Sequence, residues 1–151
     1  MVQSFVVDTS ILIQGFVRER DTARVRTLLH STIAPEPTAT VYVPEFCVVE
    51  CANILWKRVV LYNRPVAEAE QGLGNLLTFP LVVRLSAEFL PRALAIGITH
   101  QLAVYDSIYL AFAERFACPL ITVDERQARA AQAVGVTLKP ITDFPEFTGQ
   151  K

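Results

Sequence analysis

Short apolar runs alternate with longer helical stretches along this chain, and this alternation restricts the fold more than any other feature of the sequence. An apolar run of this length is typical of a buried strand that is covered on both faces. Strands that alternate with helices form a parallel sheet with right-handed crossovers, so the pattern predicts the α/β class. The expected strands are residues 3–8, 41–43, 81–85, 120–124 and a short fifth at 136–138.

Prolines and glycines mark several ends of the helices expected between these strands. Pro44 and Pro65 stand where helices begin, Ser86 is expected to cap a helix that contains Pro91, and Gly135 closes another. The expected helices are a short one after Thr9 and Ser10, and then residues 19–31, 45–62, 66–78, about 88–97, 104–117 and 125–134.

The chain has 151 residues, which suffices for one domain with a full core, so we expect a single domain over 1–151 with an irregular tail at 140–151. Its hydrophobic content of 52% suits a sheet buried on both faces or an oligomer. The net charge of −1 provides no general attraction for nucleic acid, although a basic rim around an acidic pocket would give the same sum.

Cellular location is predicted from three negative features. The three cysteines do not form the framework of a disulfide-rich protein, which favours a reducing compartment and hence the cytoplasm. Cys47 and Cys51 share a helix face and are expected to pack there. We see no signal peptide and no apolar run long enough to cross a membrane.

Four carboxylates occupy positions where the pattern favours apolar residues. Asp8 and Asp124 each end an apolar strand, and the carboxyl ends of parallel strands share one edge of the sheet, where chemistry collects in α/β folds. Glu50 has Phe46, Cys47 and Ile54 as helical neighbours, and Asp106 stands in the first turn of the most apolar helix. Each residue alone has a structural alternative, either a helix cap or one member of a buried ion pair.

Together the four carboxylates predict a site for a divalent cation. Carboxylates that are brought together repel one another, and a cation removes that cost. Ligand sets made only of oxygen favour Mg²⁺ or Mn²⁺ over zinc. Such an ion polarises a phosphate and orients an attacking water, so no histidine base is needed. His30 and His100 are accordingly expected at the surface.

Four segments carry a resemblance to a known family. The chain resembles the PIN-domain ribonucleases, and most of all the VapC-type toxins of type II toxin–antitoxin pairs. The matching segments, in the order and spacing of the family, are VVDTS at 6–10, ECAN at 50–53, YDSIYLA at 105–111 and TVDER at 122–126.

The resemblance implies a three-layer α/β/α fold around a mainly parallel sheet of four to five strands. It also implies an Mg²⁺- or Mn²⁺-dependent endoribonuclease in which Asp8, Glu50, Asp106 and Asp124 hold the metal. Thr122 matches a hydroxyl that orients neighbouring carboxylates, and Ser10 matches a position near the scissile phosphate. Asn53 is expected to hold the Glu50 side chain.

Partners are implied by the same resemblance. VapC-type proteins form homodimers, act on RNA and are silenced by a VapB-like antitoxin that fills a groove, here between residues 11–31 and 45–78. The candidates for exposed groove residues are Phe16, Leu55, Trp56 and Val60, with core packing as the alternative for Trp56. The candidates for contacts to RNA phosphates or antitoxin carboxylates are Arg18, Arg20, Lys57 and Arg58, and ordinary solubilising charge is the alternative for each of them.

Other functions fit the sequence less well. A haloacid-dehalogenase phosphatase needs a second Asp where Ser10 stands, and a receiver domain needs an early acidic pair that is missing. A PIN-like module that binds RNA or protein without catalysis remains the alternative, and the complete set of four carboxylates argues against it.

Overall fold

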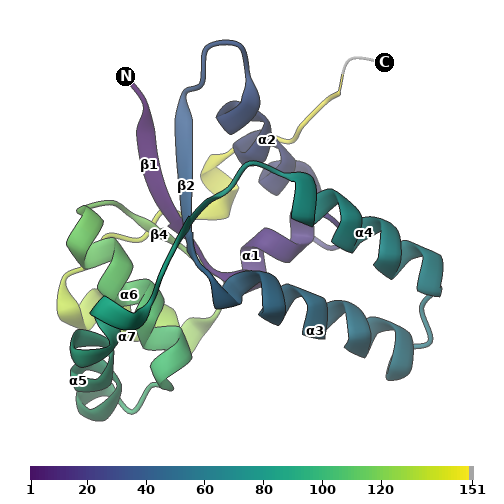
Figure 1. Ribbon diagram of the computed structural model, residues 1–151. Helices are drawn as coiled ribbons and strands as arrows, with labels where there is room; N and C mark the ends of the chain where they lie inside the picture. The colour runs from purple at the N-terminus through teal and green to yellow at the C-terminus, as the bar shows by residue number, and fades with distance from the viewer. Residues whose placement is uncertain (150–151) are drawn as a thin grey trace.

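The computed structural model describes residues 1–149 and contains a parallel four-stranded sheet with the order β3-β2-β1-β4 (Figure 1). The strands are β1 (Gln3–Val7), β2 (Ala39–Pro44), β3 (Val82–Arg84) and β4 (Leu120–Ile121). In register, Phe5 pairs with Val41 and Val6 pairs with Leu120, so β1 is central. The predicted α/β class and parallel sheet are confirmed, with four strands.

The helices and short 3₁₀ turns form the two outer layers. α6 packs against β1, β2 and β4 on one face of the sheet, and α2 packs against β2 on the other. α3 and α4 pair as a hairpin that extends away from the sheet (Figure 1). The elements are α1 (Thr9–Leu12), η1 (Ile13–Gly15), α2 (Thr22–Ile33), α3 (Phe46–Val60), α4 (Val66–Thr78), η2 (Ala87–Phe89), α5 (Leu90–His100), α6 (Val104–Phe116), α7 (Glu125–Val134) and η3 (Ile141–Asp143).

The core lies on both faces of the sheet, with buried side chains from α6 on one face and from α2 on the other. Val6 and Val7 of β1 and Tyr109 and Phe112 of α6 have no exposed surface. Burying an aliphatic or phenyl side chain in this way stabilises the fold by about 1.5–3 kcal/mol each. α6 is consequently the helix most firmly attached to the sheet.

Two expected strands differ in the structure. The fourth strand is only Leu120–Ile121, because Thr122, Val123 and Asp124 turn toward the start of α7. The expected fifth strand at 136–138 is reduced to one bridge between Leu120 and Leu138, so it does not extend the sheet.

Two expected helix boundaries were wrong. α2 begins at Thr22 rather than at residue 19, because the Thr22 hydroxyl accepts a hydrogen bond from Glu19 N and donates one to Val17 O. α5 runs to His100, beyond Gly97. A Cβ at Gly97 would lie 2.6 Å from Leu102 O, so this glycine lets the backbone that follows α5 pack closely against the helix.

Ser86 and Pro91 lie at the start of the α5 region. Ser86 makes no side-chain cap, and its hydroxyl instead donates to Glu45 Oε1 at 2.7 Å. Pro91 is in the first turn of α5, where the missing N–H leaves no helix carbonyl unpaired.

The C-terminal segment packs on α2 as far as the structure describes it. Phe147 N donates to Ala23 O at 2.9 Å, and the ring of Phe144 meets Phe5 edge to face. The tail expected to be irregular thus contains one 3₁₀ turn, η3, and residues 150–151 lie outside the described residues. Within residues 1–149, no helix has the length and hydrophobicity needed to span a bilayer.

Candidate active site

The carboxyl ends of β1 and β4 place two aspartates at one edge of the sheet. Asp8 directly follows β1, and its N–H donates to Ile121 O of β4 at 3.1 Å. Asp124 lies three residues beyond β4 and is the N-cap residue of α7. The order of the strands therefore brings together two residues that are 116 positions apart in the chain (124 − 8).

Two helices add the remaining carboxylates to this edge. Glu50 comes from α3 and Asp106 from the first turn of α6. An open cleft of about 550 Å³ contains five of the six predicted site residues, the exception being Thr122. Its lining is Asp8, Thr9, Ser10, Phe46, Val49, Glu50, Asn53, Ile54, Lys57, Tyr105, Asp106 and Asp124.

Two hydroxyl groups fix the Asp8 side chain. Ser10 Oγ donates to Asp8 Oδ2 at 2.6 Å and Thr122 Oγ1 donates to the same oxygen at 3.0 Å. Asp8 is only 6% exposed, and this burial raises the pKa of its carboxyl although the hydrogen bonds oppose the rise. Ser10 and Thr122 therefore orient an aspartate whose charge is poorly solvated.

The Glu50 side chain is held by Thr9 and Tyr109. Glu50 Oε1 accepts from Thr9 Oγ1 at 3.0 Å and from Tyr109 OH at 2.9 Å, and the two hydroxyl oxygens lie 2.7 Å apart. The expectation that Asn53 holds Glu50 was wrong, since no hydrogen bond joins these two residues within the described chain. Tyr109 stands one helical turn after Asp106, and this spacing in the sequence places both side chains on the same face of the helix.

Asp106 shows that the four carboxylates act on one another. Its side chain is half-buried, and its pKa is raised to about 6, first by burial and then by the negative charges of Asp8, Asp124 and Glu50, while Arg126 opposes the rise. Such mutual repulsion is the cost that a bound cation would remove.

Gln127 is a further residue of this region that the sequence did not indicate. Its side chain is fully buried, and its Nε2 donates to the backbone oxygen of Asp106 at 3.0 Å. This bond ties the start of α6 to α7. Gln127 Oε1 has no hydrogen-bond partner among the described residues.

The helix-cap interpretation holds for Asp124 alone. Asp124 Oδ1 accepts from Gln127 N at 2.8 Å and so caps α7. Asp8 precedes α1 without a side-chain cap, and α6 is preceded by Ala103, so Asp106 is not a cap either. Capping therefore explains one of the four carboxylates.

The donor set suits a hard divalent cation. All four charged groups offer oxygen, and Glu50 Oε2 accepts no hydrogen bond from residues 1–149. In the same residues, no three His, Cys, Asp or Glu side chains already lie close enough together to form a coordination sphere.

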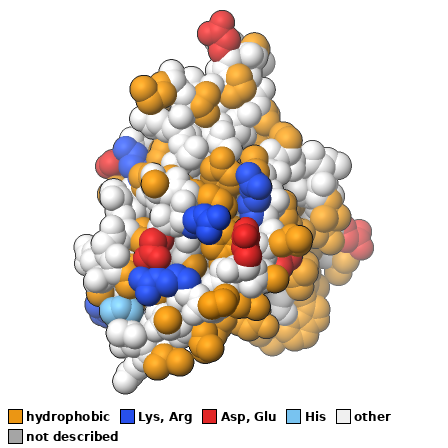
Figure 2. Space-filling view, turned by 60° about the vertical axis from the view of Figure 1, so that its left-hand side comes forward, with side chains coloured by type: hydrophobic (Ala, Val, Ile, Leu, Met, Phe, Trp, Pro, Cys, Tyr) orange, Lys and Arg blue, Asp and Glu red, His pale blue; other side chains and the backbone are white. Residues whose placement is uncertain are grey.

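The expected groove and phosphate contacts are partly corrected. Trp56 and Val60 are exposed, but Leu55 is buried in the core. Arg58 is mostly covered and pairs with both Glu19 and Glu68, so its charge is already neutralised. Lys57 lines the cleft, and Arg18 shares a neighbouring hollow with it. Acidic side chains in the middle of the face drawn in Figure 2 are flanked by Lys and Arg.

Comparison with known proteins defines the class. The PIN domain family model matches residues 5–133, which is most of the chain, and the chain belongs to this family. The family assignment made from the four acidic segments is confirmed. Among curated proteins, Ribonuclease VapC3 of Pyrobaculum aerophilum is 36% identical over 87 residues. The match covers 56% of this chain and 66% of that relative, which is just under two thirds of its length.

Solved structures share the fold at low identity. The crystal structure of PAE2754 from Pyrobaculum aerophilum has a TM-score of 0.70 at 19% identity, covering 95% of this chain and 94% of that one. VapBC2 from Rickettsia felis, solved with a DNA fragment from its promoter, has a TM-score of 0.61 at 12% identity, covering 91% and 98%. The three-layer α/β/α architecture expected from the resemblance is therefore confirmed.

Proposed function

We propose that this protein is a metal-dependent endoribonuclease that hydrolyses phosphodiester bonds in RNA with Mg²⁺ or Mn²⁺. The observation that carries the proposal is the convergence of Asp8, Glu50, Asp106 and Asp124 on one cleft, where burial and then the charges of the other three raise the pKa of Asp106. The PIN family membership and the similarity to a protein named as a ribonuclease support the substrate class.

Each residue of the cleft has a role in this proposal. Asp8, Glu50, Asp106 and Asp124 hold the ion, which when bound polarises the phosphate and activates a water for in-line attack. Thr122 and Ser10 keep Asp8 oriented, and Ser10 stands at the rim where a phosphate enters. Thr9 and Tyr109 fix one oxygen of Glu50. These contacts orient the side chains of Asp8 and Glu50 before substrate binds, which reduces the reorganisation needed at these two residues.

Cleavage by the purified protein tests this function. We expect single-stranded RNA to be cut with Mg²⁺ or Mn²⁺ and to stay intact in EDTA, and Asp8→Asn and Asp106→Asn to lose cleavage while remaining folded. Glu36→Gln, which removes an exposed carboxylate far from the cleft in sequence, is the matched control. Equal cleavage by wild type and both cleft variants would exclude the metal site. RNA binding without cleavage would favour the non-catalytic alternative.

We further propose that the protein is the toxin of a toxin–antitoxin pair, acting in the cytoplasm on cellular RNA. The names VapC3 and VapBC2 of two similar proteins support this role, and the three free cysteines agree with a reducing compartment. A VapB-like antitoxin would cover the α3–α4 hairpin, where Trp56 and Val60 are 53% and 57% exposed.

Expression in a bacterial host tests the toxin role. Growth should stop when the wild-type chain is induced and resume when the product of a small adjacent open reading frame is co-expressed. Asp8→Asn should be harmless. Normal growth under induction of a soluble, RNA-cleaving wild type would exclude the toxin role while leaving the nuclease intact.

A homodimer is also proposed, and α5 is the surface that favours it. Leu90, Leu94 and Ile98 stand four residues apart on this helix and are 42%, 51% and 72% exposed. Hydrophobic side chains gather on the lower part of the face shown in Figure 2. Light scattering should give twice the chain mass for wild type and a monomer for Leu94→Glu, and a monomeric wild type would refute the dimer.

A further inference from the structure

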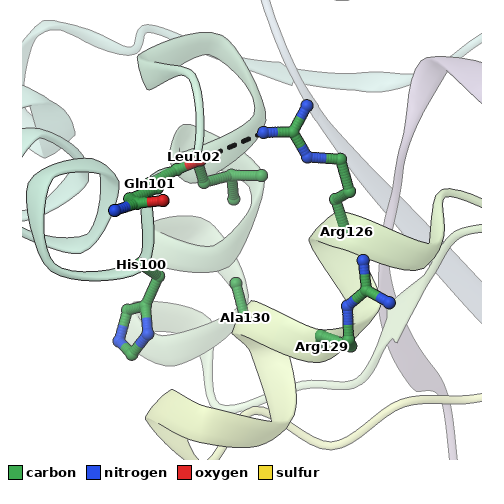
Figure 3. Close-up of a pocket in the computed structure, with 6 residues that line it drawn as sticks. All are labelled: His100, Gln101, Leu102, Arg126, Arg129 and Ala130. Carbon is green, nitrogen blue, oxygen red and sulfur yellow. Dashed lines mark hydrogen bonds between the residues drawn. The ribbon is translucent and has the colours of Figure 1, made fainter.

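A second hollow lies beside the acidic cleft and is basic in character. It has a volume of about 260 Å³ and is formed between the end of α5 and the first turns of α7 (Figure 3). Of the described residues, no Asp or Glu lines it. Its walls are His100, Gln101, Leu102, Arg126, Arg129 and Ala130.

The local structure arranges the cationic groups around this hollow. Arg126 and Arg129 are three residues apart on α7, so their side chains leave the same side of the helix. Ala130 lies between Arg129 and His100 in Figure 3, and its small side chain fills little of the space there. Opposite, Gln101 ends α5 in a left-handed conformation, φ +53°, and its carbonyl accepts a hydrogen bond from Arg126 Nη2 at 3.3 Å.

Both guanidinium groups keep their positive charge available. Within residues 1–149, neither Arg126 nor Arg129 pairs with a carboxylate, whereas Arg58, Arg64 and Arg92 are all paired. A guanidinium offers a planar set of donors that matches two oxygens of a phosphate. The His100 ring lines the hollow from the end of α5 and points away from the two arginines (Figure 3). The hollow therefore offers two unpaired guanidinium groups to an anion, and no carboxylate of the described residues lines it.

The hollow is adjacent to the carboxylates. Arg126 is two residues after Asp124, and it donates a hydrogen bond to the carbonyl of Gln101, five residues before Asp106. Between the two sites, Gln127 donates to the Asp106 carbonyl. Lys57 of α3 lies on the other flank of the cleft, and α3 and α7 leave the sheet edge in opposite directions (Figure 1). Cations thus bracket the acidic centre.

We propose that this hollow binds a backbone phosphate of the RNA next to the phosphate that is cut. The inference rests on the proposed ribonuclease function. Four carboxylates repel a polyanionic strand, so a strand that crosses them requires cations on each side. The contact would be to phosphate rather than to a base, and it would fix the register of the strand without reading its sequence.

RNA binding in EDTA, where the proposed reaction is stopped, tests this contact. The probe is a fluorescent single-stranded 12-mer, and affinity is measured by anisotropy between about 50 and 200 mM salt. Arg126→Gln/Arg129→Gln should bind more weakly at low salt. The slope of log Kd against log salt should fall by about 0.7 for each phosphate that the variant no longer neutralises.

The matched control is Arg115→Gln, which removes an exposed arginine at the far end of α6 that forms no ion pair within residues 1–149. It should bind like wild type. Cleavage by the double variant with Mn²⁺ should show a higher KM for the 12-mer. If the double variant has the affinity, salt slope and KM of wild type while wild type cleaves RNA, the inference fails and the nuclease stands.

Inorganic phosphate and a hexaglutamate peptide separate the remaining outcomes. In wild type, phosphate should shift the NMR signals of the His100 ring and the Gln101 amide, and it should not do so in the double variant. If wild type neither binds nor cuts RNA, the proposed function fails. The NMR shifts induced by phosphate then show by themselves whether the hollow binds an anion. Binding of the peptide but not of RNA would overturn the assignment to RNA, and an absence of shifts would overturn the site itself.

Discussion

Thr122 Oγ1 donates a hydrogen bond to Asp8 Oδ2 and accepts one from Asp124 N, both at 3.0 Å. One hydroxyl group thereby joins the ends of β1 and β4 and relates two of the four carboxylates to each other. Because β4 contains only Leu120 and Ile121, this side-chain bridge continues the connection where the backbone ladder stops.

Thr122→Val removes this bridge at nearly constant volume. We expect RNA cleavage to fall by about 10–100-fold, the usual loss when a group that orients a metal ligand is removed. The fold should persist, because the Asp8 carboxylate and the Asp124 N–H lie beside the open cleft and can bind water in place of the lost hydroxyl. The measurement is the initial rate with Mn²⁺. Thr137→Val, at an exposed threonine whose side chain forms no hydrogen bond within residues 1–149, should keep the wild-type rate; an equal rate for Thr122→Val would show that the bridge is dispensable.

Tyr109→Phe separates the stability of the Glu50 network from its chemistry. The Tyr109 hydroxyl is buried between Glu50 and Thr9, so its loss leaves polar groups short of a partner. The free energy of unfolding should fall by about 1–3 kcal/mol in urea denaturation, and cleavage should also decrease. Tyr105→Phe is the control, because Tyr105 is 63% exposed. Equal stability of the two variants would contradict the network.

Asp106 predicts how stability depends on pH in EDTA. Its pKa is about 6 in the folded protein and 3.8 ordinarily, so between these values the folded state keeps a proton that the unfolded chain has lost. The free energy of unfolding should therefore fall as the pH rises from about 3.8 to 6, and the loss is complete above 6.

Asp106→Asn removes that part of the pH dependence. Compared with wild type, the variant should be more stable above pH 6 and should show a flatter profile below it. Urea midpoints at half-unit pH steps provide the measurement, with Glu36→Gln as the control. If the urea midpoint of Asp106→Asn depends on pH as that of wild type does, burial and the charges of Asp8, Asp124 and Glu50 do not raise the pKa of Asp106.

Asp124 can be tested for its two roles separately. Asn caps a helix about as well as Asp, so Asp124→Asn should keep the stability of α7 while metal affinity falls. Asp124→Ala should lose the cap as well, at a cost of about 1 kcal/mol. Calorimetric titration with Mn²⁺ and urea denaturation measure the two effects, and a stable, fully metal-binding Asp124→Asn would leave capping as the only role.

Divalent ions should raise the thermal midpoint of the wild-type protein. An ion at 100 times its Kd stabilises the folded state by about 2.7 kcal/mol. Asp8→Asn should show no such rise, and in EDTA it should be at least as stable as wild type, since removing one charge reduces repulsion. Equal shifts by Mg²⁺ in wild type and Asp8→Asn would place the ion elsewhere.

Much of the fold followed from local patterns. The buried strands, the parallel sheet and the proline-led α3 and α4 depend on apolar periodicity and backbone chemistry within a few residues of each position. The errors arose where tertiary contacts decide. α5 continues past Gly97, where the backbone of Leu102 packs against the glycine, and the expected fifth strand at 136–138 retains only the bridge between Leu120 and Leu138.

The sequence by itself determined which residues carry charge where apolar residues were expected, and strand order then made Asp8 and Asp124 neighbours. Only the tertiary structure decided what surrounds them. The hydrogen bonds among Thr9, Glu50 and Tyr109 join positions 41 to 100 residues apart and leave no periodic trace in the chain. The same holds for the Arg126 and Arg129 hollow, because a pocket depends on how two elements meet and not on either sequence alone.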